Sequence, residues 1–210
     1  MIIKKIAKLC KRAGAVVLWY DARHDTQWIS NGSAAWPLYG MPMLDTDNVL
    51  TVLDIPEKDW PKITVREMAL PEAYDFNDDY EGGELGNPVV TISYGGQLLM
   101  PLSTTSGTLL VDPELFAPLR DNNQLTVHLR REQSGQGKPY LAVKRGLLLQ
   151  GIVMPLSYSP YAALPDILAH LAKDLAASMT DAAEEREEDE EQYEIDPTTG
   201  EVMEGDTDNE

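Results

Sequence analysis

The chain has 210 residues, of which 43% are hydrophobic, so it is long and apolar enough to fold around a core of its own. Its formal net charge is −18, from 35 acidic and 17 basic residues. No apolar run reaches the roughly 18 residues that a transmembrane helix needs, and the single cysteine, Cys10, excludes an internal disulfide and a multi-cysteine zinc site. We therefore expect a cytoplasmic protein without membrane partners.

The first predicted element is an amphipathic helix. Apolar residues recur at helical spacing from Ile2 to Cys10, and Gly14 is a suitable end for the helix. Basic residues occupy the other face, where they could contact DNA phosphates, the acidic tail of the protein or only solvent. These candidate nucleic-acid ligands are Lys4, Lys5, Lys8, Lys11 and Arg12.

Two stretches that follow share one order of elements. In residues 1–70 we predict a short helix at 47–54 and strands at 15–20, 26–30, 34–39 and 63–69. In residues 89–180 we predict a helix that starts at Asp112-Pro113-Glu114 and strands at 89–94, 97–103, 125–131, 140–143 and 147–154. Because Trp36-Pro37-Leu38 overlays Met100-Pro101-Leu102 and later elements follow at similar offsets, we predict two similar β-β-α-β lobes.

Acidic residues gather in two segments outside these lobes. Residues 71–88 carry six of them among Pro, Gly and Asn, and we predict that this segment connects the lobes. Residues 181–210 carry fifteen acidic residues and one basic residue, so we expect this tail to be disordered. Within the tail, a turn at 197–200 predicts either a transient hairpin or a docking peptide for a partner, formed by Tyr193, Ile195 and Val202.

The second lobe carries a candidate basic patch and a final helix. His128 and Arg130 alternate with apolar residues in a strand and are expected to point outward. With Lys144 and Arg145 on the next strand, they would form either a phosphate-binding patch or a solvated sheet face. The helix, at 165–179, should pack on the sheet through an apolar stripe of Ile167, Leu168, Leu171, Leu175 and Met179.

The sequence supplies few groups for catalysis. His24 lies between Asp21 and Asp25, which could bind a metal ion with it or could simply form a polar turn. The three histidines and the cysteine are scattered, so local sequence pairs no nucleophile with a base. Trp28 and Trp36 could offer a stacking platform for a base or could belong to the core. We therefore predict a binding protein that is not an enzyme and has neither a metal site nor a cofactor.

The second lobe resembles the repeating unit of DNA sliding clamps, the processivity factors of replication. The resemblance rests on the stretch 107–119, the strand at 124–131 and the strands at 140–143 and 147–154. It implies an α+β fold, mainly antiparallel sheet, in which a strand, a short helix and three strands make half of a domain. It also implies DNA and replication proteins as partners, and a homo-oligomer, because one chain holds only one clamp domain.

Three functions are compatible with these features. The one we favour is a clamp-like accessory factor of DNA replication or repair, in a chain with the general style of phage and mobile-element proteins. The second is an acidic interaction or decoy protein that inhibits a nucleic-acid-binding or defence partner through its tail. The third is a sponge for small nucleotides that uses the tryptophans of the first lobe.

Overall fold

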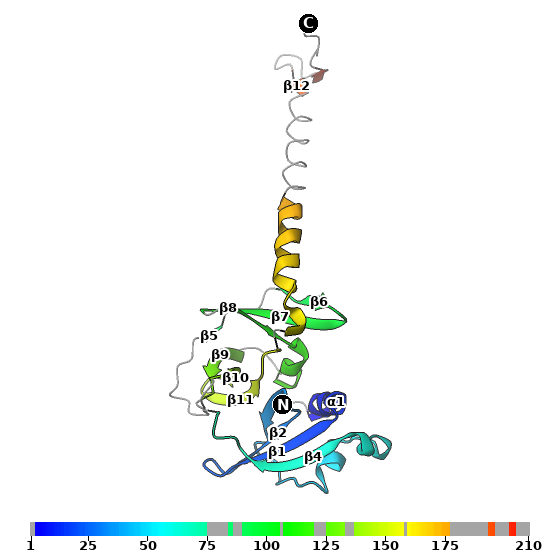
Figure 1. Cartoon of the computed structure of the whole chain (residues 1–210), viewed down its shortest axis with the longest axis vertical. Coiled ribbons are helices and arrows are strands. Elements are labelled where there is room, and N and C mark those ends of the chain that lie inside the picture. Colours follow the sequence, from blue (N-terminus) through cyan, green and yellow to red (C-terminus); the bar gives the residue numbers. More distant parts are fainter. Residues whose placement is uncertain are drawn as a thin grey trace. The chain divides into compact units, whose positions relative to one another are not determined.

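The computed structural model describes residues 3–74, 84–85, 90–105, 107–119, 125–132, 137–157, 159–176, 193–195 and 202–204. The chain divides into two compact units, Met1–Ser157 and Tyr158–Glu210. The first unit has an α+β fold with a mixed, mostly antiparallel main sheet (Figure 1). Among the described residues, no helix combines the length and the apolar character needed to cross a membrane.

The main sheet of the first unit has eight strands in the order β4-β1-β2-β3-β11-β10-β9-β5. Strand β4 runs parallel to β1, and the other neighbouring strands are antiparallel. The strands are β1 (Ala15–Asp21), β2 (Thr26–Ser30), β3 (Ala34–Pro37), β4 (Thr64–Ala69), β5 (Glu84–Leu85), β9 (Leu125–Arg131), β10 (Pro139–Arg145) and β11 (Leu148–Val153). A separate antiparallel sheet is formed by β6 (Ile92–Tyr94), β7 (Gln97–Thr104) and β8 (Gly107–Val111).

Within the described residues of the first unit, the helices are one long helix and three short ones. The predicted basic helix is confirmed as α1 (Ile3–Ala13), and Gly14 ends it with a φ of +65°. The helix predicted after Asp112 is a 3-10 helix, η2 (Pro113–Leu119), and Pro118 within it has no amide to donate to a helical hydrogen bond. The other two are α2 (Val49–Val52) and the 3-10 helix η1 (Glu57–Lys62).

Strands from both predicted lobes lie in the main sheet, and they meet where β3 pairs with β11. This seam consists of the pairs Ala35↔Ile152 and Ala34↔Val153. On one side of it the order is β3-β2-β1, and on the other it is β11-β10-β9. Each set of three strands follows a helix in the chain, α1 or η2. Two halves, each a helix and three strands, therefore face each other across the seam.

The predicted β-β-α-β repeat does not match this arrangement. Trp36 lies on β3 in the main sheet, whereas its predicted counterpart, Met100, lies on β7 in the separate sheet. Strand β4 lies parallel to β1 at the sheet edge, whereas its predicted counterpart, β9, lies antiparallel to both of its neighbours. The prediction aligned elements by their order along the chain, but strand partners are chosen by long-range contacts that this order does not specify.

The main core lies on the sheet face that α1 and η2 cover. Ile6 and Leu9 of α1 and Leu115 and Phe116 of η2 are buried there with residues of both halves of the sheet. A smaller cluster around Trp28, Tyr140 and Ile152 occupies the opposite face. Because both faces are apolar at the centre, β2, β3 and β10 show runs of buried residues instead of a simple alternation.

In the second unit, the 3-10 helix η3 (Ser159–Tyr161) precedes a helix at 164–176. The apolar residues Ile167, Leu168, Leu171 and Leu175 of that helix are exposed, and their predicted packing on the sheet stays a prediction. Strands β12 (Tyr193–Ile195) and β13 (Val202–Glu204) form an antiparallel pair, as the hairpin alternative predicts, and the turn at 197–200 lies outside the described residues. The rest of the tail, and residues 75–83 and 86–89 of the predicted connector, lie outside the described residues.

Candidate functional site

The five basic residues of α1 lie on the side of the helix that faces away from the core. Three of them form ion pairs with acidic residues from later in the chain. The Lys8 ammonium lies 3.4 Å from Glu114, and the Arg12 guanidinium lies 2.6 Å from Asp112 and also contacts Glu114. The Lys11 ammonium lies 2.6 Å from Asp59. These contacts tie α1 to η1 and η2.

The paired acids reduce the positive charge that α1 presents. The pKa of Asp59 is lowered, mainly by its hydrogen bond with Lys11, and Lys62 lies 3.5 Å from the same carboxylate. Lys4 and Lys5 make no ion pair within the part of the chain that the structure describes. They are therefore the α1 side chains whose charge is best placed to act on a ligand.

The second predicted basic patch does not form one exposed surface. Arg130 is 1% exposed and Lys144 is 7% exposed, and register places both on the sheet face of the smaller cluster. Arg145 is exposed but belongs to the other face, where its guanidinium donates to the Leu119 carbonyl at 3.5 Å. His128 is half-buried beside the Thr126 hydroxyl, 3.0 Å away. The prediction of an exposed patch is wrong for Arg130 and Lys144, because it assumed that solvent covers the second face.

Of the two alternatives for Trp28 and Trp36, the structure supports the core and not the stacking platform. Trp28 and Trp36 are both buried, and they belong to the clusters on opposite faces of the sheet. The register Ile29↔Trp36 explains this, since directly paired residues share a face and Trp28 precedes Ile29. The two indoles cannot sandwich or line a common ligand.

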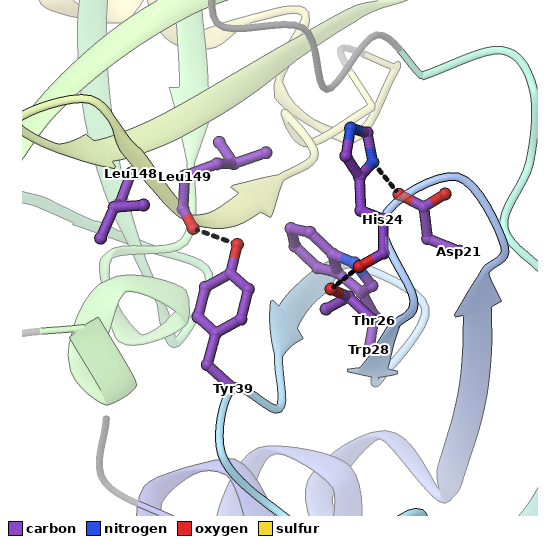
Figure 2. Close-up of a pocket in the computed structure, with 7 residues that line it drawn as sticks. All are labelled: Asp21, His24, Thr26, Trp28, Tyr39, Leu148 and Leu149. Carbon is purple, nitrogen blue, oxygen red and sulfur yellow. Dashed lines mark hydrogen bonds and ion pairs between the residues drawn. The ribbon is translucent and has the colours of Figure 1, made fainter.

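A pocket of about 260 Å³ opens beside Trp28, in the main sheet (Figure 2). It lies where β3 ends at Pro37, while β2 on one side and β11 on the other extend further. Gly40, with a φ of +70°, helps turn the chain away at this point, and the Tyr39 hydroxyl donates to the Leu149 carbonyl at 3.2 Å. The lining residues are Asp21, His24, Thr26, Trp28, Tyr39, Leu148 and Leu149.

The turn between β1 and β2 holds the polar side of this pocket. The buried Asp21 carboxylate accepts the Arg23 backbone N–H at 3.0 Å and lies 2.6 Å from Nδ1 of His24. Burial raises the pKa of Asp21, but the hydrogen bonds and positive charge of His24 and Arg23 outweigh it, so the net pKa is lowered. The carboxylate therefore orients an imidazole that is itself 58% exposed.

The turn does not resemble a metal site. Asp21 faces His24, whereas Asp25 accepts a hydrogen bond from the Tyr20 hydroxyl at 2.8 Å. No group of three or more histidine, cysteine or acidic residues suited to a metal occurs among the described residues. The Thr26 hydroxyl donates to the His24 carbonyl, so it is not held as a nucleophile against the imidazole.

Sequence reasoning found only part of this pocket. The polar residues Asp21 and His24 were singled out, but Tyr39, Leu148 and Leu149 were not. They come from segments more than a hundred residues apart, which become neighbours only through the β3–β11 pairing. The early end of β3 has a local signal, because Pro37 has no N–H to continue a ladder and a glycine follows closely.

The predicted partner-binding residues of the tail lie in the second unit. Ile195 pairs with Val202, and Tyr193 pairs with Glu204. Their role as partner contacts stays a prediction. Comparison of the chain with known protein families, curated proteins and solved structures found no match.

Proposed function

We propose that this protein is a non-catalytic, clamp-like accessory factor of DNA replication or repair in a phage or mobile element. The observation that carries the proposal is the seam between β3 and β11, where two halves of a helix and three strands meet in one sheet. In the second half, β8 precedes η2, which completes the order of strand, helix and three strands. This order supports the resemblance to half of a sliding-clamp domain.

The two helices indicate which surface of the protein would contact DNA. Both α1 and η2 pack on the same face of the sheet, so the outer side of this helical layer is the surface that DNA would meet. Lys4 and Lys5 supply positive charge there, whereas Glu114 of η2 and Asp112, just before η2, offset that of Lys8 and Arg12. We therefore expect weak, salt-sensitive contact with DNA, in which encirclement by several copies holds the protein on the duplex.

The first experiment measures the mass of the full chain in solution by light scattering on a sizing column. A closed oligomer of several copies supports the proposal, because one chain carries only two clamp-like halves. A monomer at all concentrations and salt conditions contradicts it, since a ring could not form.

The second experiment tests the surface by charge reversal. The double variant Lys4→Glu/Lys5→Glu should bind duplex DNA more weakly, and the slope of log affinity against log salt should fall by about 0.9 for each phosphate that the variant no longer neutralises. The double variant Lys138→Glu/Lys173→Glu is the charge-matched control, because both are exposed lysines outside α1. Equal binding by all three proteins, or no binding by the parent chain, would reject α1 as the DNA-contacting element.

A further inference from the structure

The carboxylate of Glu114, on η2, is held by two cations of α1. Its Oε1 atom lies 3.4 Å from the Lys8 ammonium, and its Oε2 atom accepts a hydrogen bond from Nη1 of Arg12. Lys8 and Arg12 are four residues apart in the helix, so their side chains are neighbours on one face of it. Two cations that contact the two oxygens of one anion form an anion-binding site, and a side chain of the protein occupies this one.

A phosphate group matches this site in both shape and charge. Like a carboxylate, a phosphodiester presents two charged oxygens on one central atom, and it carries a single negative charge. Guanidinium and ammonium groups are the side-chain groups that bind phosphate in proteins. Replacement of the Glu114 carboxylate by a backbone phosphate of DNA therefore leaves the charge of the site unchanged.

The Arg12 guanidinium keeps its place in such an exchange. Its Nη2 atom lies 2.6 Å from Oδ2 of Asp112, whose side chain is only 11% exposed. The other oxygen of Asp112, Oδ1, accepts the backbone amide of Glu114 at 2.8 Å. These contacts use none of the atoms that join Arg12 to the Glu114 side chain, so they persist when that side chain moves away. Asp112 is therefore a positioning residue for the site.

The Glu114 side chain has room to move away. It is 37% exposed, and its partner Lys8 is 71% exposed, so water reaches the pair. A cavity of about 400 Å³ opens beside it, lined by Arg12, Asp112, Glu114 and the segment 96–98, where β7 begins. Exposed ion pairs of this kind are weak, so a phosphate can compete with the carboxylate for the two cations.

We propose that Lys8 and Arg12 form a phosphate-binding site that Glu114 occupies in the free protein, and that a phosphate of the DNA backbone enters by displacing Glu114. The inference rests on the proposed contact of α1 with DNA, and it adds two side chains and their competitor to that contact. Glu114 lowers the affinity of this surface for DNA, because its ion pairs have to break before the phosphate binds.

The first test measures binding of the full chain to a short DNA duplex by fluorescence anisotropy at low salt. Glu114→Gln removes the charge but keeps the size of the side chain, and it should bind roughly two- to fivefold more tightly, as expected for one exposed ion pair. Glu72→Gln is the matched control, because Glu72 is an exposed glutamate outside α1 and η2. The inference fails if Glu114→Gln gains no more affinity than Glu72→Gln.

A second background shows whether the gain acts through the two cations. Lys8→Gln removes one of them at an exposed position and leaves Arg12 paired with Asp112. In this background, Glu114→Gln should raise the affinity by a smaller factor than in the parent chain, because only Arg12 remains to be released. The same factor in both backgrounds would contradict a shared site.

Carbodiimide cross-linking of the unsubstituted chain follows Glu114 directly. The reagent joins an ammonium to a carboxylate that is in contact with it, so the free protein should give a cross-link between Lys8 and Glu114. Saturation with duplex should suppress this cross-link, and its persistence at saturation would overturn the displacement. Because no variant is involved, this experiment decides the inference even if Glu114→Gln does not fold.

The failure of this inference can be distinguished from the failure of the proposed function. If the parent chain and Glu114→Gln both bind DNA with equal affinity, only the inference is overturned. If neither protein binds DNA, the proposed contact of α1 with DNA is overturned and this inference with it.

Discussion

Gly151 offers a direct test of the seam that joins the two halves of the sheet. A Cβ atom built at this position would lie 2.9 Å from the Ala35 carbonyl oxygen, 3.2 Å from Cδ1 of Trp36 and 3.4 Å from Cδ1 of Leu119. Real Cβ atoms essentially never come within 3.0 Å of another heavy atom. The nearest neighbour is backbone, and it belongs to a residue that pairs with Ile152, so it cannot move without disturbing the seam.

The substitution Gly151→Ala should therefore destabilise the protein. Overpacking of a buried site costs about 1–3 kcal/mol, and the backbone contact places this position toward the upper end. The entropic benefit of replacing glycine by alanine offsets about 0.4–1 kcal/mol of that cost. The net loss should be about 2 kcal/mol, which corresponds to a fall of roughly 4–8 °C in Tm for a unit of this size.

Urea unfolding followed by far-ultraviolet circular dichroism measures this loss, with an unchanged m-value as evidence that the transition is the same. Gly146→Ala is the control, because nothing lies within 4 Å of a Cβ there and only its φ of +58° opposes the substitution, at about 1 kcal/mol. If Gly151→Ala is as stable as the parent chain or more stable, then β3 and β11 are not packed against each other as described.

Three further measurements test other parts of the fold. Burial raises the pKa of Cys10 to about 12, so at pH 8 its thiol should react with Ellman's reagent only after unfolding; rapid labelling of the native protein would contradict this. The lowered pKa of Asp21 stabilises the fold above a pH of about 4, and this stability is lost on further acidification. The urea midpoint should therefore fall less between pH 7 and pH 3 in Asp21→Asn than in the parent chain. Equal falls in the two proteins would contradict this role of Asp21. A double-mutant cycle of Arg12→Ala and Glu114→Ala should give a coupling free energy of unfolding below about 1 kcal/mol, because both side chains are partly exposed. Added salt should reduce this coupling energy. A larger value that does not depend on salt would be inconsistent with the exposure of the pair.

Local patterns were sufficient to predict many of the individual elements. The bounds of β2 and β9 match the prediction, because alternation and turn residues mark both ends of each strand. The predicted helix start at Asp112 is also confirmed. Helix η2 begins at the next residue, and the Asp112 carboxylate accepts the Glu114 backbone amide at 2.8 Å. These features depend on residues close together in the chain, which is the information that periodicity contains.

Such local patterns could not predict the register of the strands or their order in the sheet. The turn after β2 is held by Asn31, whose side chain accepts the amides of Ser33 and Ala34, and this turn sets the register that separates Trp28 from Trp36. Similarly, alternation placed Arg130 on the face away from Leu129, but it could not show that this face is covered as well. A polar residue in a strand was interpreted as solvent-facing, whereas a sheet with two buried faces has no such side at its centre.

The seam explains why the pocket and the two-half arrangement both escaped prediction from sequence. The signals that end β3, Pro37 and the nearby glycine, are local, but they do not show which strand lies across from it. Only the pairing of β3 with β11 brings Leu148 and Leu149 opposite the turn that carries His24. Because β3 is the shortest strand between two longer neighbours, the same pairing that completes the sheet also leaves an opening in it. The candidate binding site is therefore a consequence of unequal strand lengths at the junction, and it cannot exist in either half alone.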